Sequence, residues 1–203
     1  MKNSKLINIL KTFSVEEMKH FDKFLASPFH SRGKNCKPLF RVMKKYYPDF
    51  KTDMISYENL HKKLYPGSKF NKQVMWNLSS ALEKMAKEFL EQIALRNDKF
   101  TRMELAISEF STRKLAYNYS QALSEMEKVI EKTGIDYDHF DKRLHMEIYK
   151  QDYYFLTDKI QYKGDSTLKS AEYQLILFLK MNVTALRDLK ILEEYHNYKI
   201  NIN

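Results

Sequence analysis

The chain has 203 residues, of which 43% are hydrophobic and 30% are charged, a composition typical of an ordered globular protein rather than a disordered one. Four glycines and four prolines are too few turn residues for an all-β fold, so we predict an all-α protein. The single cysteine excludes an internal disulfide, which fits a reducing compartment.

The N-terminus, MKNSKLINIL, has too short an apolar run for a signal peptide, and no stretch approaches the roughly 18 apolar residues of a membrane span. We therefore expect a cytoplasmic protein with no membrane span.

The net charge of +9 is unevenly distributed. Residues 1–72 hold 16 Lys and Arg against 6 Asp and Glu, whereas residues 73–203 hold 19 against 20. All four prolines lie in the first region. The composition therefore predicts a basic N-terminal helical subdomain over 1–72 and long antiparallel helices over 73–203.

The first clear helix signal is a capping box formed by Ser14 and Glu17. We expect this helix to stop at Ala26 or Ser27, because Pro28 disfavours helical geometry in the residue before it. A loop from residue 28 to 35 follows. Pro38 is tolerated in the first turn of the next helix, which we expect to run to about Tyr47.

A short helix over 56–64 and a long one from Asn71 complete the N-terminal half, with Ser56 and Asn71 as N-caps. The long helix carries apolar residues at alternating spacings of three and four. They are Met75, Leu78, Leu82, Met85 and Phe89.

Four further apolar stripes follow, separated by short breaks around residues 97–98, 118, 134 and 164. Such short connections predict antiparallel αα-hairpins. The stripes are Phe100, Met103, Ile107 and Phe110; Tyr119, Leu123, Met126 and Ile130; Phe140, Leu144, Ile148 and Leu156; and Leu168, Leu175, Phe178, Leu186 and Leu189.

Residues 118–132, NYSQALSEMEKVIEK, resemble the second helix of a tetratricopeptide (TPR) repeat. Ala122, Met126 and Val129 occupy the positions of the inward-facing residues. The preceding helix lacks the Trp, Leu-Gly and Tyr signature, and no proline follows. The resemblance implies TPR-like hairpins stacked as a right-handed solenoid or a bundle.

The N-terminal 90 residues resemble a family of uncharacterised bacterial helical proteins. The segments FSVEEMKHFDKFLASPFH and YYPDF carry the resemblance, through the patterns F-S-x-x-E, F-x-x-F-L-x-S-P and Y-P-x-F. The family has no assigned activity, so it implies a helical fold but no chemistry.

Candidate catalytic or metal-binding groups are sparse. One cluster joins Asp138, His139, Asp141 and His145, but it lacks zinc-site spacing, and we interpret the two histidines as ordinary helix residues. Cys36 has no recognisable partner base, and no two glycines share a loop that could cradle a phosphate. We therefore expect no enzyme activity and no cofactor.

The basic region is the most informative surface feature, because no acidic residue lies between Asp22 and Asp49. A helix over 37–47 would present a cationic stripe opposite an apolar one. The candidate partner or phosphate surface comprises Lys23, Phe29, Arg32, Lys34, Lys37, Arg41, Lys44, Lys45, Lys72 and Gln73.

Two functions fit these observations. The first is a non-enzymatic helical scaffold that binds another protein. The alternative is nucleic-acid binding through the basic region, with a helix-turn-helix variant in which the helix from Lys72 presents Gln73 and Trp76. We favour Trp76 as a core anchor instead.

Overall fold

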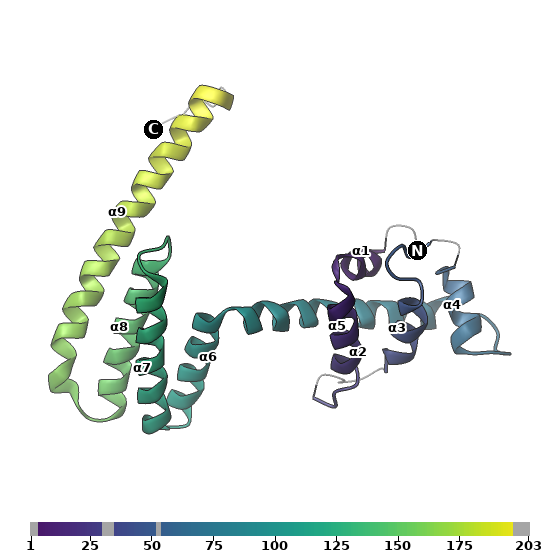
Figure 1. The fold of residues 1–203 in the computed structure, drawn as a ribbon, viewed down its shortest axis with the longest axis horizontal. Helices are drawn as coiled ribbons and strands as arrows, with labels where there is room; N and C mark the ends of the chain where they lie inside the picture. The colour runs from purple at the N-terminus through teal and green to yellow at the C-terminus, as the bar shows by residue number, and fades with distance from the viewer. Residues whose placement is uncertain (1–3, 30–34, 52–53, 197–203) are drawn as a thin grey trace. The chain divides into compact units, whose positions relative to one another are not determined.

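The computed structural model describes residues 4–29, 35–51 and 54–196, and Figure 1 shows its fold. Its described part is helical and contains no strand, which confirms the all-α prediction. The helices are α1 (Lys5–Thr12), α2 (Val15–Phe24), α3 (Lys37–Lys44), α4 (Tyr57–Leu64), α5 (Lys72–Asn97), α6 (Lys99–Thr112), α7 (Ala116–Thr133), α8 (His139–Leu156), the 3₁₀ helix η1 (Ile160–Tyr162) and α9 (Lys163–His196).

The chain divides into two compact units, residues 1–97 (unit 1) and 98–203 (unit 2). The packing boundary therefore follows α5, 25 residues beyond the compositional boundary predicted at residue 72. The reason is that α5 begins where the composition changes, but its apolar stripe is buried against the short helices before it.

Unit 1 is built around α5, which contacts each of α1, α2, α3 and α4. The centre of its core is aromatic: Phe21 is fully buried, with its ring centroid 4.8 Å from Phe40, 5.2 Å from Phe89 and 5.5 Å from Phe13. Rings at these separations pack favourably beyond the apolar area that they remove from water. The predicted α5 stripe is confirmed, with Met85 partly buried at its edge.

Side-chain caps begin the helices of unit 1 as the sequence predicts. Ser14 and Glu17 form the complete capping box of α2. Ser56 Oγ accepts the backbone N–H of Asn59 at 3.2 Å, and Asn71 Oδ1 accepts that of Val74 at 3.1 Å. α2 and α3 end two to three residues earlier than predicted, at Phe24 and Lys44, because hydrogen-bonded turns replace their last turns.

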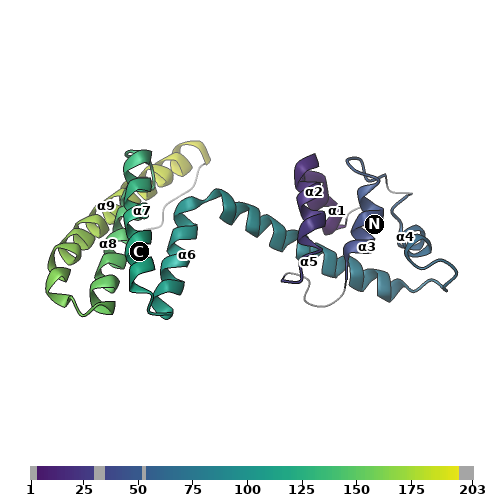
Figure 2. The same cartoon turned by 60° about the horizontal axis from the view of Figure 1, so that its bottom comes forward.

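Unit 2 contains α6, α7, α8, η1 and α9, and each α-helix packs against the next one in sequence (Figure 2). The apolar stripes predicted for α6 and α7 form its core, together with Met146. Among the residues of the TPR resemblance, Met126 is buried, while Ala122 and Val129 are half-buried against the core. The hairpin arrangement agrees with the prediction, and a TPR-like solenoid stays a prediction.

Two of the four predicted breaks are wrong. Asn118 lies inside α7 and Gly164 lies in the first turn of α9. The true ends of α6 and α8 are Schellman motifs, in which Lys114 (φ 56°) and Asp158 (φ 55°) take the left-handed conformation that glycine usually takes. Leu115 N donates to Phe110 O, and Lys159 N to Tyr154 O, each at 2.8 Å.

Candidate interaction surfaces

The basic surface predicted on α3 is present in the structure. Leu39, Phe40 and Met43 are buried, and the cationic side chains project from the other side of the helix. Arg41 Nε lies 3.6 Å from Asp22 Oδ1. This is the ion pair that the candidate partner or phosphate surface forms among the described residues. The other cations of this helix and its C-cap are Lys37, Lys44 and Lys45, and none of them forms an ion pair with a carboxylate of the described residues.

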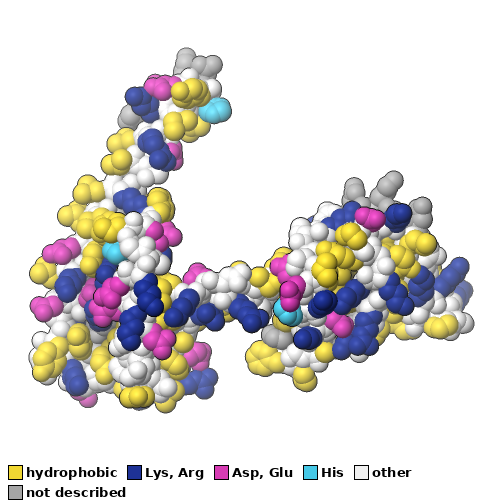
Figure 3. Space-filling model, in the orientation of Figure 1, with side chains coloured by type: hydrophobic (Ala, Val, Ile, Leu, Met, Phe, Trp, Pro, Cys, Tyr) yellow, Lys and Arg dark blue, Asp and Glu magenta, His cyan; other side chains and the backbone are white. Residues whose placement is uncertain are grey.

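The remaining predicted surface residues lie elsewhere on unit 1. Lys23 on α2 is exposed, and so is Phe29, at 75% of its surface. Arg32 and Lys34 lie outside the described residues. On the face that Figure 3 shows, Lys and Arg side chains gather over unit 1.

Lys72 and Gln73 lie in the first turn of α5, and both are exposed. The structure corrects the prediction that Trp76 anchors the core, because its side chain is 55% exposed. The buried side of this turn is taken by Met75. Phe70, Lys72, Gln73 and Trp76 instead line a shallow hollow beside Asn71. The start of α5 therefore presents an aromatic and a cation together.

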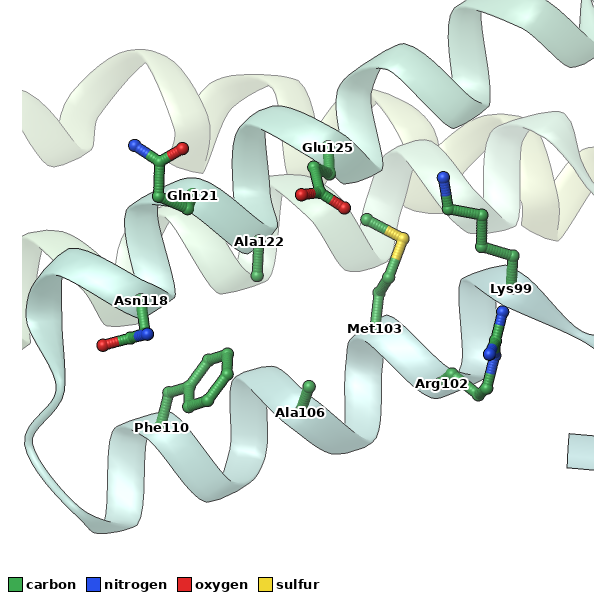
Figure 4. A pocket seen from close by; sticks show the side chains of 9 residues that line it. All are labelled: Lys99, Arg102, Met103, Ala106, Phe110, Asn118, Gln121, Ala122 and Glu125. Carbon is green, nitrogen blue, oxygen red and sulfur yellow. The ribbon is translucent and has the colours of Figure 1, made fainter. Parts of the chain in front are cut away.

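A groove runs between α6 and α7 in unit 2 (Figure 4). Met103, Ala106, Phe110 and Ala122 form its apolar lining. Ala106 and Ala122 lie opposite each other, and their small side chains keep the groove open at its middle. The polar lining residues are Lys99, Arg102, Asn118, Gln121 and Glu125.

The candidate metal cluster is not assembled, since no group of three or more His, Cys, Asp or Glu that could hold a metal occurs among the described residues. His145 Nδ1 lies 2.5 Å from Glu104 Oε1 instead. At the start of α8, Asp136 Oδ1 accepts the backbone N–H of Asp138 at 3.1 Å, and the side chain of Asp138 makes no cap hydrogen bond. A 2.9 Å hydrogen bond from Lys142 lowers the pKa of Asp136.

Cys36 does not lie at the surface. It is buried in the core of unit 1, and its Sγ lies 3.9 Å from the carbonyl oxygen of Leu78. The thiol therefore packs as a core side chain between α3 and α5.

The interface between α8 and α9 is lined by small and polar side chains. Ser166 and Ser170 are the buried residues of α9. Gln151 of α8 donates to Ser166 O at 3.3 Å and to Ser170 Oγ at 3.1 Å. Beside them, the buried carboxylate of Glu147 is paired with Lys150 at 3.0 Å. The first turns of α9 thus offer little aliphatic surface to α8, and half-buried Tyr173 and Leu177 follow on the same side.

Most of the large apolar side chains of α9 lie on its other side, contrary to the predicted core stripe. Leu168, Leu175, Phe178 and Leu186 are between 60% and 66% exposed. At 3.6 residues per turn, the leucines lie within about 40° of one another and opposite Ser166 and Ser170. We define the outer face of α9 as the set of exposed residues Leu168, Leu175, Phe178, Leu179, Val183 and Leu186.

The length of α9 adds to this exposure. α9 has 34 residues and α8 has 18, so about 24 Å of α9, at 1.5 Å per residue, has no counterpart in α8. Figure 1 shows this end of the helix beyond α8, and Figure 3 shows apolar side chains along it. No helix in the described part of the chain is long and apolar enough to span a membrane.

Comparison with known proteins gives no match to a protein-family model, a curated protein or a solved structure. The two resemblances found in the sequence therefore stay predictions.

Proposed function

We propose that this protein is a non-enzymatic helical scaffold that binds another protein molecule through the outer face of α9. The observation that carries the proposal is the reversed polarity of this helix. Its fully buried residues are two serines, whereas most of its large aliphatic residues face solvent. Large contiguous apolar patches of this kind are uncommon on monomeric soluble proteins and mark interaction sites.

The geometry favours a helical partner. The exposed leucines of the outer face recur every four or seven residues, so they form a stripe that a second helix can follow. The only charged residue between Glu172 and Arg187 is Lys180, and its Nζ donates to the carbonyl oxygen of Tyr137. The stripe can therefore be covered without burying an unpaired charge.

A capture experiment with matched variants tests this proposal. The full chain, its Leu175→Lys variant and its Leu105→Lys variant are immobilised and exposed to a lysate of the organism that makes the protein. Leu105 is 52% exposed on α6 and Leu175 is 60% exposed on α9, so both variants place the same charge at an exposed leucine. We expect a protein retained by the wild type and by Leu105→Lys, and lost from Leu175→Lys. Equal retention by all three would contradict the proposal.

Nucleic-acid binding by unit 1 is a second candidate, which two observations favour. Within the part of the chain that the structure describes, Arg41 is the cation of α3 that pairs with a carboxylate, and Trp76 is exposed beside Lys72. Phosphate attraction and base stacking use these two side-chain types. Fluorescence titrations with generic duplex DNA and RNA at two salt concentrations test it. Binding should weaken steeply as salt rises, and no binding at low salt removes this candidate.

A further inference from the structure

We propose that the occupant of the outer face of α9 is a second copy of this chain, paired antiparallel with the first along α9. The inference rests on the proposed function, which makes this face a protein-binding surface, and it adds the identity and the direction of the partner helix.

Three exposed leucines, exposed Asn182 and half-buried Leu189 have the spacing of a helix–helix seam. Leu175, Leu179, position 182, Leu186 and Leu189 follow one another at intervals of four, three, four and three residues. This alternation keeps one line of side chains facing a partner helix in a coiled coil. The seam lies opposite the serines that face α8, so a second helix can approach without displacing α8.

The charges at the ends of the seam favour the antiparallel direction. Glu172 and Lys190 lie 18 residues apart, at the same angular position around the helix. With a two-fold axis near residue 181, Glu172 of one copy lies beside Lys190 of the second copy, at both ends of the seam. A parallel pair would put the two Glu172 carboxylates at one level and the two Lys190 amines at another.

The same two-fold axis places apolar residues of the two copies beside each other and leaves the Asn182 amide as a polar group within the seam. Leu175 meets Leu186 of the second copy, and Leu179 meets Asn182 of the second copy. With the axis between positions 180.5 and 181, the two Asn182 residues would be about 3–4.5 Å apart along the helix direction, at 1.5 Å per residue, within reach of each other. Asn182 Nδ2 donates to Phe178 O at 2.7 Å, which leaves Oδ1 to accept. A single polar residue in an apolar seam fixes register and partner number.

Sedimentation velocity of the full chain between about 1 and 100 µM tests the pairing. We expect a dimer whose dissociation constant rises at least about tenfold in Leu179→Lys, because the new charge would be buried in the seam. Leu105→Lys on α6 is the matched control and should dimerise like the wild type. A monomer at 100 µM, or a dimer that Leu179→Lys leaves unchanged, overturns the inference.

Charge exchange tests the direction. Glu172→Lys and Lys190→Glu should each weaken the dimer, because each places like charges together. The double variant should recover the wild-type dissociation constant, whereas a double variant weaker than both single ones overturns the antiparallel arrangement. A monomeric chain that still retains a host protein through α9 would contradict only this inference. A monomeric chain that retains none would contradict the proposed function as well.

Discussion

The imidazole Nδ1 of His145 on α8 lies 2.5 Å from the carboxylate oxygen Oε1 of Glu104 on α6. The same oxygen accepts the hydroxyl of Tyr149 at 3.2 Å. Because an ionised carboxylate can only accept hydrogen bonds, Nδ1 carries the proton in this contact. One side chain of α6 thereby holds two successive turns of α8 in place across the core of unit 2.

We expect Glu104→Ala to lower the free energy of unfolding by about 1.5 kcal/mol, because it removes a hydrogen-bond acceptor that is 19% exposed and leaves two donors unpaired. Urea unfolding followed by circular dichroism measures the change. Glu109→Ala on the same helix is the control. Glu109 pairs with Arg113 at the surface, so its removal should cost no more than a few tenths of a kcal/mol, and equal losses in both variants would contradict the assignment.

The alkaline limit of stability should depend on Tyr149. Burial, and next the charge of Glu104, raise the pKa of Tyr149 from 10 to about 12. A raised pKa means that the folded state holds this proton more tightly than the unfolded state does. The stabilisation is complete below pH 10 and is lost as the pH rises from 10 to 12. Melting temperatures measured from pH 8 to pH 12 should therefore fall less steeply in Tyr149→Phe than in the wild type, and parallel curves would contradict this.

How far the sequence predicts this fold depends on whether local signals decide the structure. The caps at Ser14, Ser56 and Asn71 are confirmed because a side chain and a nearby backbone N–H settle them. α1 was not predicted, although Leu6, Ile7 and Leu10 bury one face of it, because eight residues give a weak periodic signal.

The surfaces were harder to predict than the helices. Periodicity identifies the apolar side of a helix, but it does not say whether another helix covers that side. The apolar residues of α6 and α7 are covered, whereas Leu175 and Leu186 of α9 are not. The serines that α8 covers instead gave no apolar signal. The prediction that Trp76 is buried is wrong for the same reason, since Met75 takes the buried position beside it.

The helix ends that the sequence did not predict offer a test of backbone strain. Lys114 and Asp158 have positive φ angles at the C-termini of α6 and α8. Glycine has no Cβ and reaches this conformation without a steric penalty. We expect Lys114→Gly to raise the free energy of unfolding by about 0.5–1 kcal/mol, and Asp158→Gly to act in the same direction.

Lys128→Gly is the control for these two variants, because Lys128 is exposed in the middle of α7. Glycine there should lower stability by about 1 kcal/mol. Thermal unfolding followed by circular dichroism distinguishes the signs, and a loss of stability in Lys114→Gly would mean that its left-handed conformation is not strained.

Close approach of α9 to α8 predicts that Ser170 cannot be enlarged. Its side chain is 7% exposed, donates to Thr167 O at 2.8 Å and accepts from Gln151. Ser170→Leu should cost about 1–3 kcal/mol through overpacking and through the loss of the Gln151 hydrogen bond. Ser124→Leu, at an exposed position of α7, should change stability by less than about 0.5 kcal/mol. Urea unfolding compares the two, and equal effects would contradict close packing at Ser170.

The aromatic core of unit 1 sets the largest expected loss of stability. Phe21 is fully buried among the rings of Phe13, Phe40 and Phe89, so Phe21→Ala removes both the buried apolar area and the ring contacts and leaves a cavity. Substitutions of this kind cost about 3–5 kcal/mol. The fluorescence of Trp76, the only tryptophan, reports on unit 1 during urea unfolding. Phe155→Ala removes the same atoms from a ring that is 70% exposed on α8, and its transition should follow the wild type. A Phe21→Ala transition within about 1 kcal/mol of the wild type would show that α5 does not depend on this cluster.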